Sequence, residues 1–317
     1  MKRLLAMIAM ACMGGGVAAQ DWPRNPVQLV VPFAPGGNVD IIARLIGEKL
    51  QKVLGQPVVV SNKPGAGGAI AADQVSRAAP DGYTFFVGSN GPLLFAPVIA
   101  GKKDFEWKRD FAVAGPVAFT PIVVVANPAL PARGMDELLK LAKERKLFMA
   151  SAGTGSTNDL LSQLIQERTG VAWTSVPYKG NAQTVVSVSS GEVDFSIEQI
   201  SAALPFIKDR RIRAIAVSSR ERSPLLPDTP TLAEAGLQGM EAVTWTGLFA
   251  PAATPVSILE RMNDALRAIS KDPDLLRGYQ PQGLQPFVLP RAEFAAYVDG
   301  ENDKWLPFVK RAFLKNP

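Results

Sequence analysis

Two glycine-rich segments carry residue types suited to holding a small anion. They are residues 32–40 (PFAPGGNVD) and residues 151–159 (SAGTGSTND). In each, glycines permit close approach of the backbone, and the residues that follow predict a helix whose first turn offers unpaired N–H groups. Such a turn can bind a carboxylate or a phosphate without Lys or Arg. The alternative is that both are ordinary strand-to-helix turns, with N-caps at Asn38, Asp40, Ser156 and Thr157.

Neither segment fits a nucleotide-binding motif. A dinucleotide site needs Gly-x-Gly-x-x-Gly, and a P-loop needs Gly-x-x-x-x-Gly-Lys-Ser/Thr. The second segment contains Gly153 and Gly155, but Asn158 occupies the place of the third glycine. We therefore expect neither dinucleotide nor P-loop chemistry, and no cofactor.

The side-chain inventory excludes several classes of enzyme. The chain contains no His, so Ser-His-Asp catalysis, Cys-His catalysis and imidazole-bound metal sites cannot be assembled. Its single Cys, Cys12, lies in an apolar N-terminal stretch. The folded body is therefore expected to lack a disulfide, a thiolate nucleophile and a structural zinc site.

The N-terminus predicts a secretory signal peptide over residues 1–19. Lys2 and Arg3 precede an apolar run, and the small residues before Gln20 suit cleavage after Ala19, which implies export to the periplasm. The apolar run is far shorter than the roughly 20 residues of a membrane-spanning helix. A membrane anchor and lipidation at Cys12 are the alternatives.

The charge balance gives no reason to expect a nucleic-acid partner. Loss of the two basic residues in the signal would lower the formal net charge from +5 to +3. The one dense basic group, residues 208–213, accompanies no zinc-finger or RNP-type motif. It is typical of a solvated helix end, where cationic side chains are favoured.

The elements that must position the two segments alternate along the chain. Short β-branched runs are followed by longer helical patterns, which is typical of βαβ units and a mostly parallel sheet. The Pro-rich stretch 223–230 predicts a linker. Predicted strands are residues 27–33, 58–60, 83–87, 122–125, 148–151, 174–176, 193–197 and 213–217. Predicted helices are residues 41–54, 69–78, 135–145, 159–169, 182–190, 203–208, 256–270, 274–279 and 291–299.

Short motifs along the chain resemble those of the Bug-type extracytoplasmic solute receptors of tripartite tricarboxylate transporters. In the N-terminal part they are PFAPGG with Asp40, NKPGAGG at 62–68 and APDGYT at 79–84. The later ones are SAGTGS at 151–156, VPYKG at 176–180, GEVD at 191–194, RSPLLPD at 222–228 and GLFAP at 247–251. They follow that family's order and cover almost the whole chain after the predicted signal.

This resemblance implies an α/β, two-domain periplasmic-binding-protein fold of type II-like architecture, with a ligand cleft between two mostly parallel sheets flanked by helices. It implies a receptor that captures a small carboxylate (an organic, amino or aromatic acid) and delivers it to an inner-membrane permease. Main-chain N–H groups, hydroxyls and bridging waters would hold the ligand. The residues expected to contact it are Phe33, Ala34, Pro35, Gly36, Gly37, Asn38, Val39 and Asp40, with Ser151, Ala152, Gly153, Thr154, Gly155, Ser156, Thr157 and Asp159.

Two departures from the family pattern concern specificity. Val39 stands where the family commonly has Thr or Ser, so one hydroxyl contact is expected to be absent. Asp159 stands where the family usually has His, and a carboxylate facing the cleft would repel a second ligand anion. This predicts a monocarboxylate, an amino acid or a ligand with a cationic group. The alternative is that Asp159 is a plain helix cap.

Five further residues at predicted strand ends are weaker candidates for the site. Ser89 and Asn90 follow one strand, and open α/β sheets bind ligands beyond the carboxyl ends of their strands. Tyr178 and Lys179 follow another, where the ammonium group could attract an anion. Glu198 follows a third, where relatives often carry Asp, and could bind an amine. Each also has a structural alternative, as a turn residue or a solvated side chain.

We expect a monomer in which the chain crosses twice between domains. The first domain would comprise residues 20–118 and 222–317, and the second residues 119–221. Crossings near residues 117–122 and 220–224 would form the hinge of a closing motion. Two alternatives remain open: a loaded receptor that signals to a sensor kinase, and an enzyme using Ser, Lys and acidic groups.

Overall fold

The computed structural model describes residues 22–102 and 105–314, so the predicted signal peptide lies outside the described residues. The strands are β1 (Val27–Val31), β2 (Val58–Asn62), β3 (Thr84–Ser89), β4 (Phe111–Ala126), β5 (Phe148–Ser151), β6 (Thr174–Pro177), β7 (Phe195–Gln199), β8 (Arg213–Val217), β9 (Val243–Pro251) and β10 (Gln285–Pro286). Their order is β2-β1-β3-β9-β4-β7-β5-β6, with β8 and β10 also pairing with β4.

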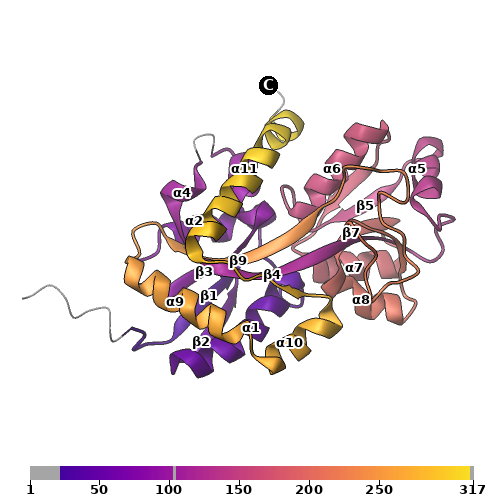
Figure 1. Cartoon of the computed structure of the whole chain (residues 1–317). Helices are drawn as coiled ribbons and strands as arrows, with labels where there is room; N and C mark the ends of the chain where they lie inside the picture. Colours follow the sequence, from indigo (N-terminus) through magenta and orange to yellow (C-terminus); the bar gives the residue numbers. More distant parts are fainter. Residues whose placement is uncertain (1–21, 103–104, 315–317) are drawn as a thin grey trace, which may run out of the picture.

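Helices flank both faces of this sheet path (Figure 1). The helices are α1 (Asn38–Leu54), α2 (Ala69–Ser76), α3 (Ala96–Ile99), α4 (Trp107–Asp110), α5 (Met135–Glu144), α6 (Thr157–Thr169), α7 (Asn181–Ser190), α8 (Ile200–Lys208), α9 (Val256–Ile269), α10 (Pro273–Tyr279) and α11 (Arg291–Phe313). Short helical turns are η1 (Ala66–Gly68), η2 (Asn90–Phe95) and η3 (Gln280–Gln282). None of the helices in the described part of the chain is long and apolar enough to cross a membrane.

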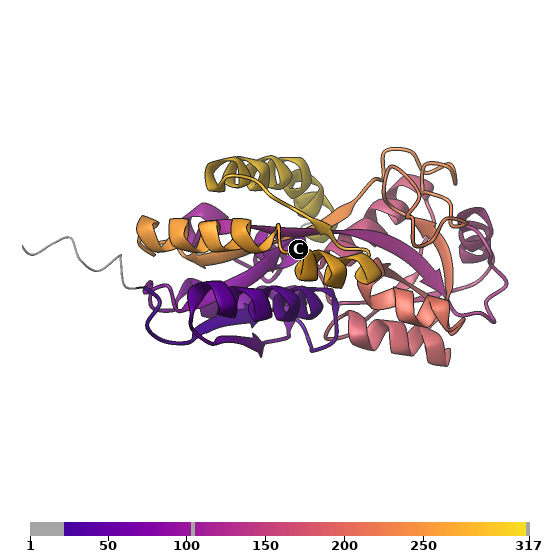
Figure 2. The same ribbon diagram turned by 60° about the horizontal axis from the view of Figure 1, so that its bottom comes forward.

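The long strand β4 connects the two halves of the molecule. It pairs antiparallel with β9 as far as Pro121, and from Ile122 onward with β7 and β8. Figure 2 shows this strand running from the half that contains α1 and α9 into the half that contains α7 and α8. The sheet is therefore mixed rather than mostly parallel as expected, because β4 and β9 run antiparallel to their neighbours. The parallel pairs are β1 with β2 and β3, and β5 with β6 and β7.

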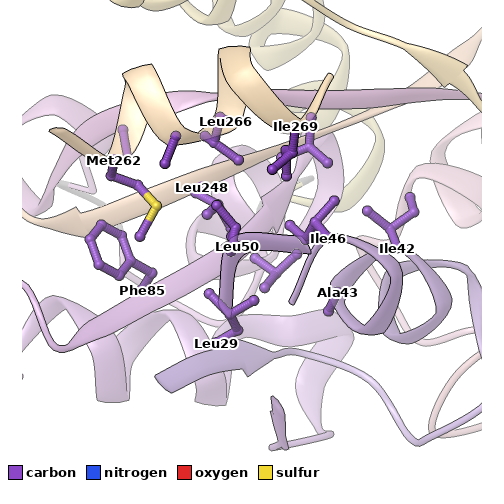
Figure 3. Close-up of a cluster of buried hydrophobic side chains, with 14 of the residues drawn as sticks. Leu29, Ile42, Ala43, Ile46, Leu50, Phe85, Leu248, Met262, Leu266 and Ile269 are labelled. Atoms are coloured by element: carbon purple, nitrogen blue, oxygen red, sulfur yellow. The ribbon is translucent and has the colours of Figure 1, made fainter. Parts of the chain in front are cut away.

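Each half has a hydrophobic core on both faces of its strands. In the first half, α1 turns Ile42, Ile46 and Leu50 toward α9 and the sheet, because residues four apart share one face of a helix (Figure 3). On the opposite face Trp245 and Phe294 meet edge to face, with ring centroids 5.8 Å apart. The second half is built in the same way, with α5 and α6 on one face and α7 and α8 on the other.

The structure differs from the sequence prediction mainly at element ends. Helix α1 begins at Asn38 and α6 at Thr157, so each starts directly after its glycine-rich loop rather than two or three residues later. Strand β9 and most of β4 were not predicted, because Gly and Pro interrupt their apolar pattern. Helix α11 extends to Phe313, well beyond residue 299, despite Pro307 in its interior.

The Pro-rich segment after β8 packs with the second half. Leu226, Leu232 and Met240 belong to its hydrophobic clusters, which otherwise contain residues from Ile122 onward. The chain therefore returns to the first half between Ala242 and Val243, later than the expected crossing at 220–224. We propose domains of residues 122–242 and of residues 22–121 with 243–314.

Candidate functional site

The two glycine-rich loops have the same local geometry, one in each half. In the first, the N–H of Gly36 donates to Asp40 Oδ2 at 2.8 Å, and in the second the N–H of Gly155 donates to Asp159 Oδ2 at 3.0 Å. Both acids occupy the third position of the helix that follows, α1 or α6. A carboxylate is favoured in a first helical turn, where it also fixes the loop. The two loops therefore share one pattern, in which an acid of the following helix binds a glycine N–H of the loop.

The two acids differ in how their charge is balanced. Burial opposes ionisation of Asp40, but Arg44, the Gly36 N–H and Asn62 hold its pKa below the usual value. Arg44 donates to both carboxylate oxygens at 2.9 Å. Asp159 has no such cation among the described residues, and burial raises the pKa of its carboxyl group to about 6. The acid of the first loop is therefore an anion balanced by Arg44, whereas the acid of the second loop is partly neutral near pH 6.

Direct hydrogen bonds join the two halves beside these loops. The N–H of Ala34 donates to the carbonyl oxygen of Lys179 at 3.0 Å. Ser201 Oγ donates to Asn38 Oδ1 at 2.7 Å. Further along, the N–H of Gly91 donates to Thr157 Oγ1 at 3.3 Å. We define these three bonds and the residues they join as the interdomain contact zone.

Glycines allow the closest approaches in this zone. A Cβ atom at Gly67 would lie 2.0 Å from the carbonyl oxygen of Thr154, and one at Gly91 would lie 2.6 Å from that of Gly155. Gly67 also has φ of +62°, which favours glycine, whereas Gly91 does not have a positive φ. Any larger residue at Gly91 would therefore hinder the approach of the two halves without straining its own backbone.

A cavity of about 350 Å³ opens beside the contact zone, with lining residues from both halves. The first half contributes Phe33 and the glycine-rich stretch 65–68, and the second contributes residues 152–154 of the loop before α6, residues 177–179 and Gln183. Lys179 is the one charged side chain among the described residues that line it. This combination of backbone, hydroxyl and a single cation suits a small anion better than a metal or a nucleotide.

Glu198 lies in β7 and is fully buried, and its carboxylate contacts Asn181 at the start of α7. Asn181 Nδ2 donates to its Oε2 atom at 2.5 Å, while Oε1 has no hydrogen-bond partner among the described residues. Burial raises the pKa of Glu198 to about 7. Asn181 begins α7, and a Cβ atom at Gly37 of the first loop would lie 3.6 Å from its backbone nitrogen, so Asn181 lies between Glu198 and that loop.

The expected site residues occupy three different settings. Those in the contact zone or facing it are Ala34, Gly36, Gly37, Asn38, Gly155, Ser156 and Thr157. Those lining the adjacent cavity are Phe33, Ala152, Gly153, Thr154, Tyr178 and Lys179. The others are the core residue Val39, the exposed Pro35, and the buried side chains of Asp40, Ser89, Asn90, Ser151, Asp159 and Glu198.

Sequence reasoning left several residues of this region out of the expected site. Gly67 and Gly91 make the closest approaches, while Ser201 and Asn181 supply polar contacts from helix starts. The stretch 65–68 carried a usable signal, because its glycines resemble those of the two chosen loops. Ser201 and Asn181 carried none, since isolated polar residues at helix starts are common caps.

Comparison with known proteins identifies relatives over nearly the whole chain. Residues 42–314 match a protein-family model described as the tripartite tricarboxylate transporter family receptor. Protein BugT from Bordetella pertussis (strain Tohama I) is 33% identical over 322 residues, covering 99% of this chain and 99% of BugT. The match therefore spans both halves and both glycine-rich loops.

Two solved structures show the same architecture. The periplasmic binding protein BugD has a TM-score of 0.86 and 31% identity, covering 92% of this chain and 98% of the BugD chain. MatC from Rhodopseudomonas palustris, solved with bound malate, has a TM-score of 0.85 and 33% identity, covering 91% of this chain and 100% of its own. The chain therefore has an α/β periplasmic-binding-protein fold, as the sequence predicted.

Proposed function

Because this chain belongs to the tripartite tricarboxylate transporter receptor family, we propose that it captures a small carboxylate between its two halves. The family consists of solute receptors rather than enzymes, so no catalytic step is needed. The observation that carries the proposal is the pair of similar loops, both of which contribute residues to the cavity that contains Lys179. Malate in the relative MatC supports a carboxylate as the ligand.

The ligand would complete the contacts between the halves. In an open state the helix starts of α1 and α6 would be separated, and their free N–H groups would face solvent. An anion between them would bind both partial positive charges at once, so it would favour the closed state over the open one. The existing bonds from Ala34 to Lys179 and from Ser201 to Asn38 would then stabilise closure further.

The output of the loaded receptor is proposed to be transport. A monomer in the periplasm would present its closed form to an inner-membrane permease, in keeping with the receptor component that the family model describes. Copurification of the carboxylate-loaded protein with the permease would support this output. Copurification with the sensor domain of a kinase instead would favour signalling.

A thermal-shift screen tests ligand capture directly. We expect malate, succinate or a related carboxylate to raise the melting temperature, since a ligand at 100 times its dissociation constant stabilises the folded state by about 2.7 kcal/mol. Mass spectrometry of the small molecules released on denaturing the purified protein provides an independent readout. An absence of both a shift and a released carboxylate across organic, amino and aromatic acids would contradict the proposal.

Asp159 is expected to tune the preference for ligand charge. Asn in its place keeps an oxygen for the Gly155 N–H but removes the charge that the acid carries above pH 6. We expect Asp159→Asn to bind malate at least fivefold more tightly than the parent at pH 8, because repulsion of about 1 kcal/mol or more is lost. At pH 5 the advantage should vanish. Calorimetric affinities that match those of the parent at both pH values would show that Asp159 acts only as a cap.

A further inference from the structure

A second cavity lies at the hinge, away from the glycine-rich loops. It encloses about 720 Å³ between the segment 219–225 of the second half and the segment 276–286 of the first, with Pro121 of β4 beside it. Small-molecule sites commonly measure 300–1,000 Å³ and lie between domains. The cavity therefore has the size and position of a ligand site, and it shares no lining residue with the cavity beside the loops.

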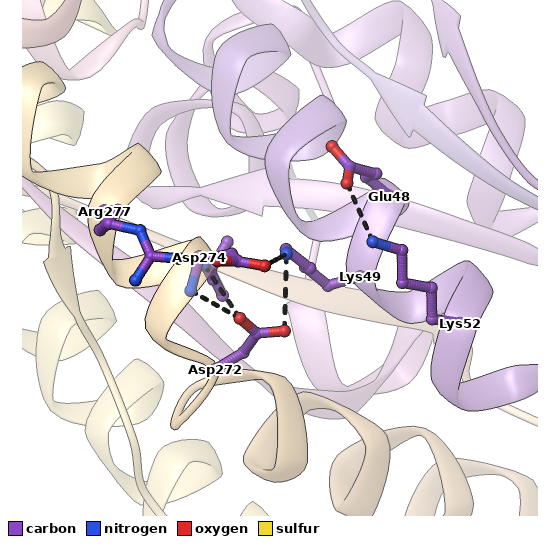
Figure 4. Close-up of polar contacts among 7 residues, drawn as sticks. Glu48, Lys49, Lys52, Asp272, Asp274 and Arg277 are labelled. Atoms are coloured by element: carbon purple, nitrogen blue, oxygen red, sulfur yellow. Dashed lines mark hydrogen bonds and ion pairs between the residues drawn. The ribbon is translucent and has the colours of Figure 1, made fainter.

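The two walls of this hinge cavity are anchored separately. Helix α10 in the first wall is held to α1 by Lys49, whose Nζ lies 3.5 Å from Asp272 Oδ2 and 3.2 Å from Asp274 Oδ2 (Figure 4). In the opposite wall, Arg222 Nε donates to both carboxylate oxygens of Glu234, at 3.1 and 2.9 Å. Each wall thus moves with its own half, and the cavity would change shape when the halves move.

The lining of the hinge cavity has a large apolar part. Leu225, Leu276 and Leu284 contribute apolar surface, and Tyr279, which is only 2% exposed, connects this surface to the core of the first half. The geometry therefore favours a ligand with a large apolar part.

Charge at the rim of the cavity favours an anionic group on this ligand. Arg220 lines the cavity and forms no hydrogen bond or ion pair within residues 22–102 and 105–314. Arg222 and Glu221 also line it, and the charge of Arg222 is balanced by Glu234. Glu221 also lines the cavity, but its carboxylate accepts no hydrogen bond from Arg220. The five N–H donors of the Arg220 guanidinium group are therefore available to a ligand.

We propose that the hinge cavity is a second ligand site, which binds an apolar carboxylic acid. The leucines contact the apolar part, and the carboxylate accepts hydrogen bonds from the Arg220 guanidinium group.

Calorimetry with 2-naphthoate tests the proposal in the Gly91→Ala variant, where closure of the main site is hindered. We expect one naphthoate to bind. Leu276, which is 38% exposed, can be enlarged without disturbing the core, and Leu276→Trp should fill the cavity and weaken binding at least tenfold. Val256→Trp, at an exposed position in α9, is the matched control and should leave the affinity unchanged.

The charge requirement is tested separately. Arg220→Gln should weaken the binding of 2-naphthoate about threefold, because an exposed ion pair contributes little free energy. The affinity for uncharged 2-naphthalenemethanol should not change. Absence of naphthoate binding, or binding that Leu276→Trp leaves unchanged, would overturn the proposal. Loss of naphthoate binding on Gly91→Ala alone would place the probe in the main site and overturn it as well. Carboxylate capture at the loops is judged by the malate shift, so the two proposals can fail independently.

Discussion

Gly91→Ala is expected to weaken carboxylate binding by between about 10-fold and 100-fold while leaving each half folded. The added methyl group would lie 2.6 Å from the carbonyl oxygen of Gly155 and 2.8 Å from the Cα atom of Ser156 when the halves are in contact. Overpacking of this kind typically costs about 1–3 kcal/mol. The cost falls on the closed state alone, so it appears as lost affinity and a faster rate of ligand release.

The matched control for this change is Gly300→Ala in α11. Gly300 also lacks a positive φ, and no atom lies within 4 Å of the added Cβ position. This variant should keep the parent affinity and gain about 0.5–1 kcal/mol of stability from helix propensity. Calorimetry with malate and small-angle scattering with and without ligand provide the readouts. Equal affinity and equal compaction for Gly91→Ala and the parent would refute closure through the contact zone.

Glu198→Gln is expected to change how stability depends on pH. The pKa of Glu198 is about 7 in the folded protein, against an ordinary value of 4.5. A carboxyl group with a raised pKa binds its proton more tightly in the folded state, so its contribution to stability falls as pH rises from about 4.5 to 7 and is constant above. A Gln side chain at this position does not ionise, so it makes no pH-dependent contribution to stability. The variant should therefore gain about 2–3 kcal/mol relative to the parent between pH 5 and pH 8.

Urea unfolding at the two pH values measures this difference. Other titrating groups, such as Asp40 with its lowered pKa, contribute slopes of the opposite sign, but these cancel when variant and parent are compared at each pH. Glu293→Gln, an exposed change in α11, is the control and should show no such gain. If Glu198→Gln and the parent lose or gain stability in parallel between pH 5 and pH 8, Glu198 does not hold its proton in the folded protein.

The sequence contained enough information to identify the two glycine-rich loops and the strand and helix that flank each of them. Glycines followed by a helical pattern require a strand-loop-helix unit, and the unit occurs twice with an acid at the corresponding helical position, Asp40 and Asp159. The order of motifs also identified the family. These features are local, so spacing along the chain was sufficient to predict them.

The sequence could not predict which loop residues face the other half. The different charge balance of Asp40 and Asp159 could be read from spacing, because Arg44 follows Asp40 by four residues in α1, whereas Gln163 stands four residues after Asp159. The contact of Asp40 with Asn62 of β2 could not be predicted in this way. Val39 was counted with the site, although its helical position turns it into the core. Side-chain direction within a helix follows from where the helix starts, and that start was predicted three residues late.

Composition, glycine spacing and motif order thus determined the class of protein, the positions of its two glycine-rich loops and the absence of histidine from the chain. Tertiary structure alone decided that Gly67 meets Thr154, that Gly91 meets Gly155, and that residues 225–242 belong with the second half. The physical reason is distance along the chain. Contacts between residues 64 or more positions apart depend on how both halves pack, and no local pattern records that packing.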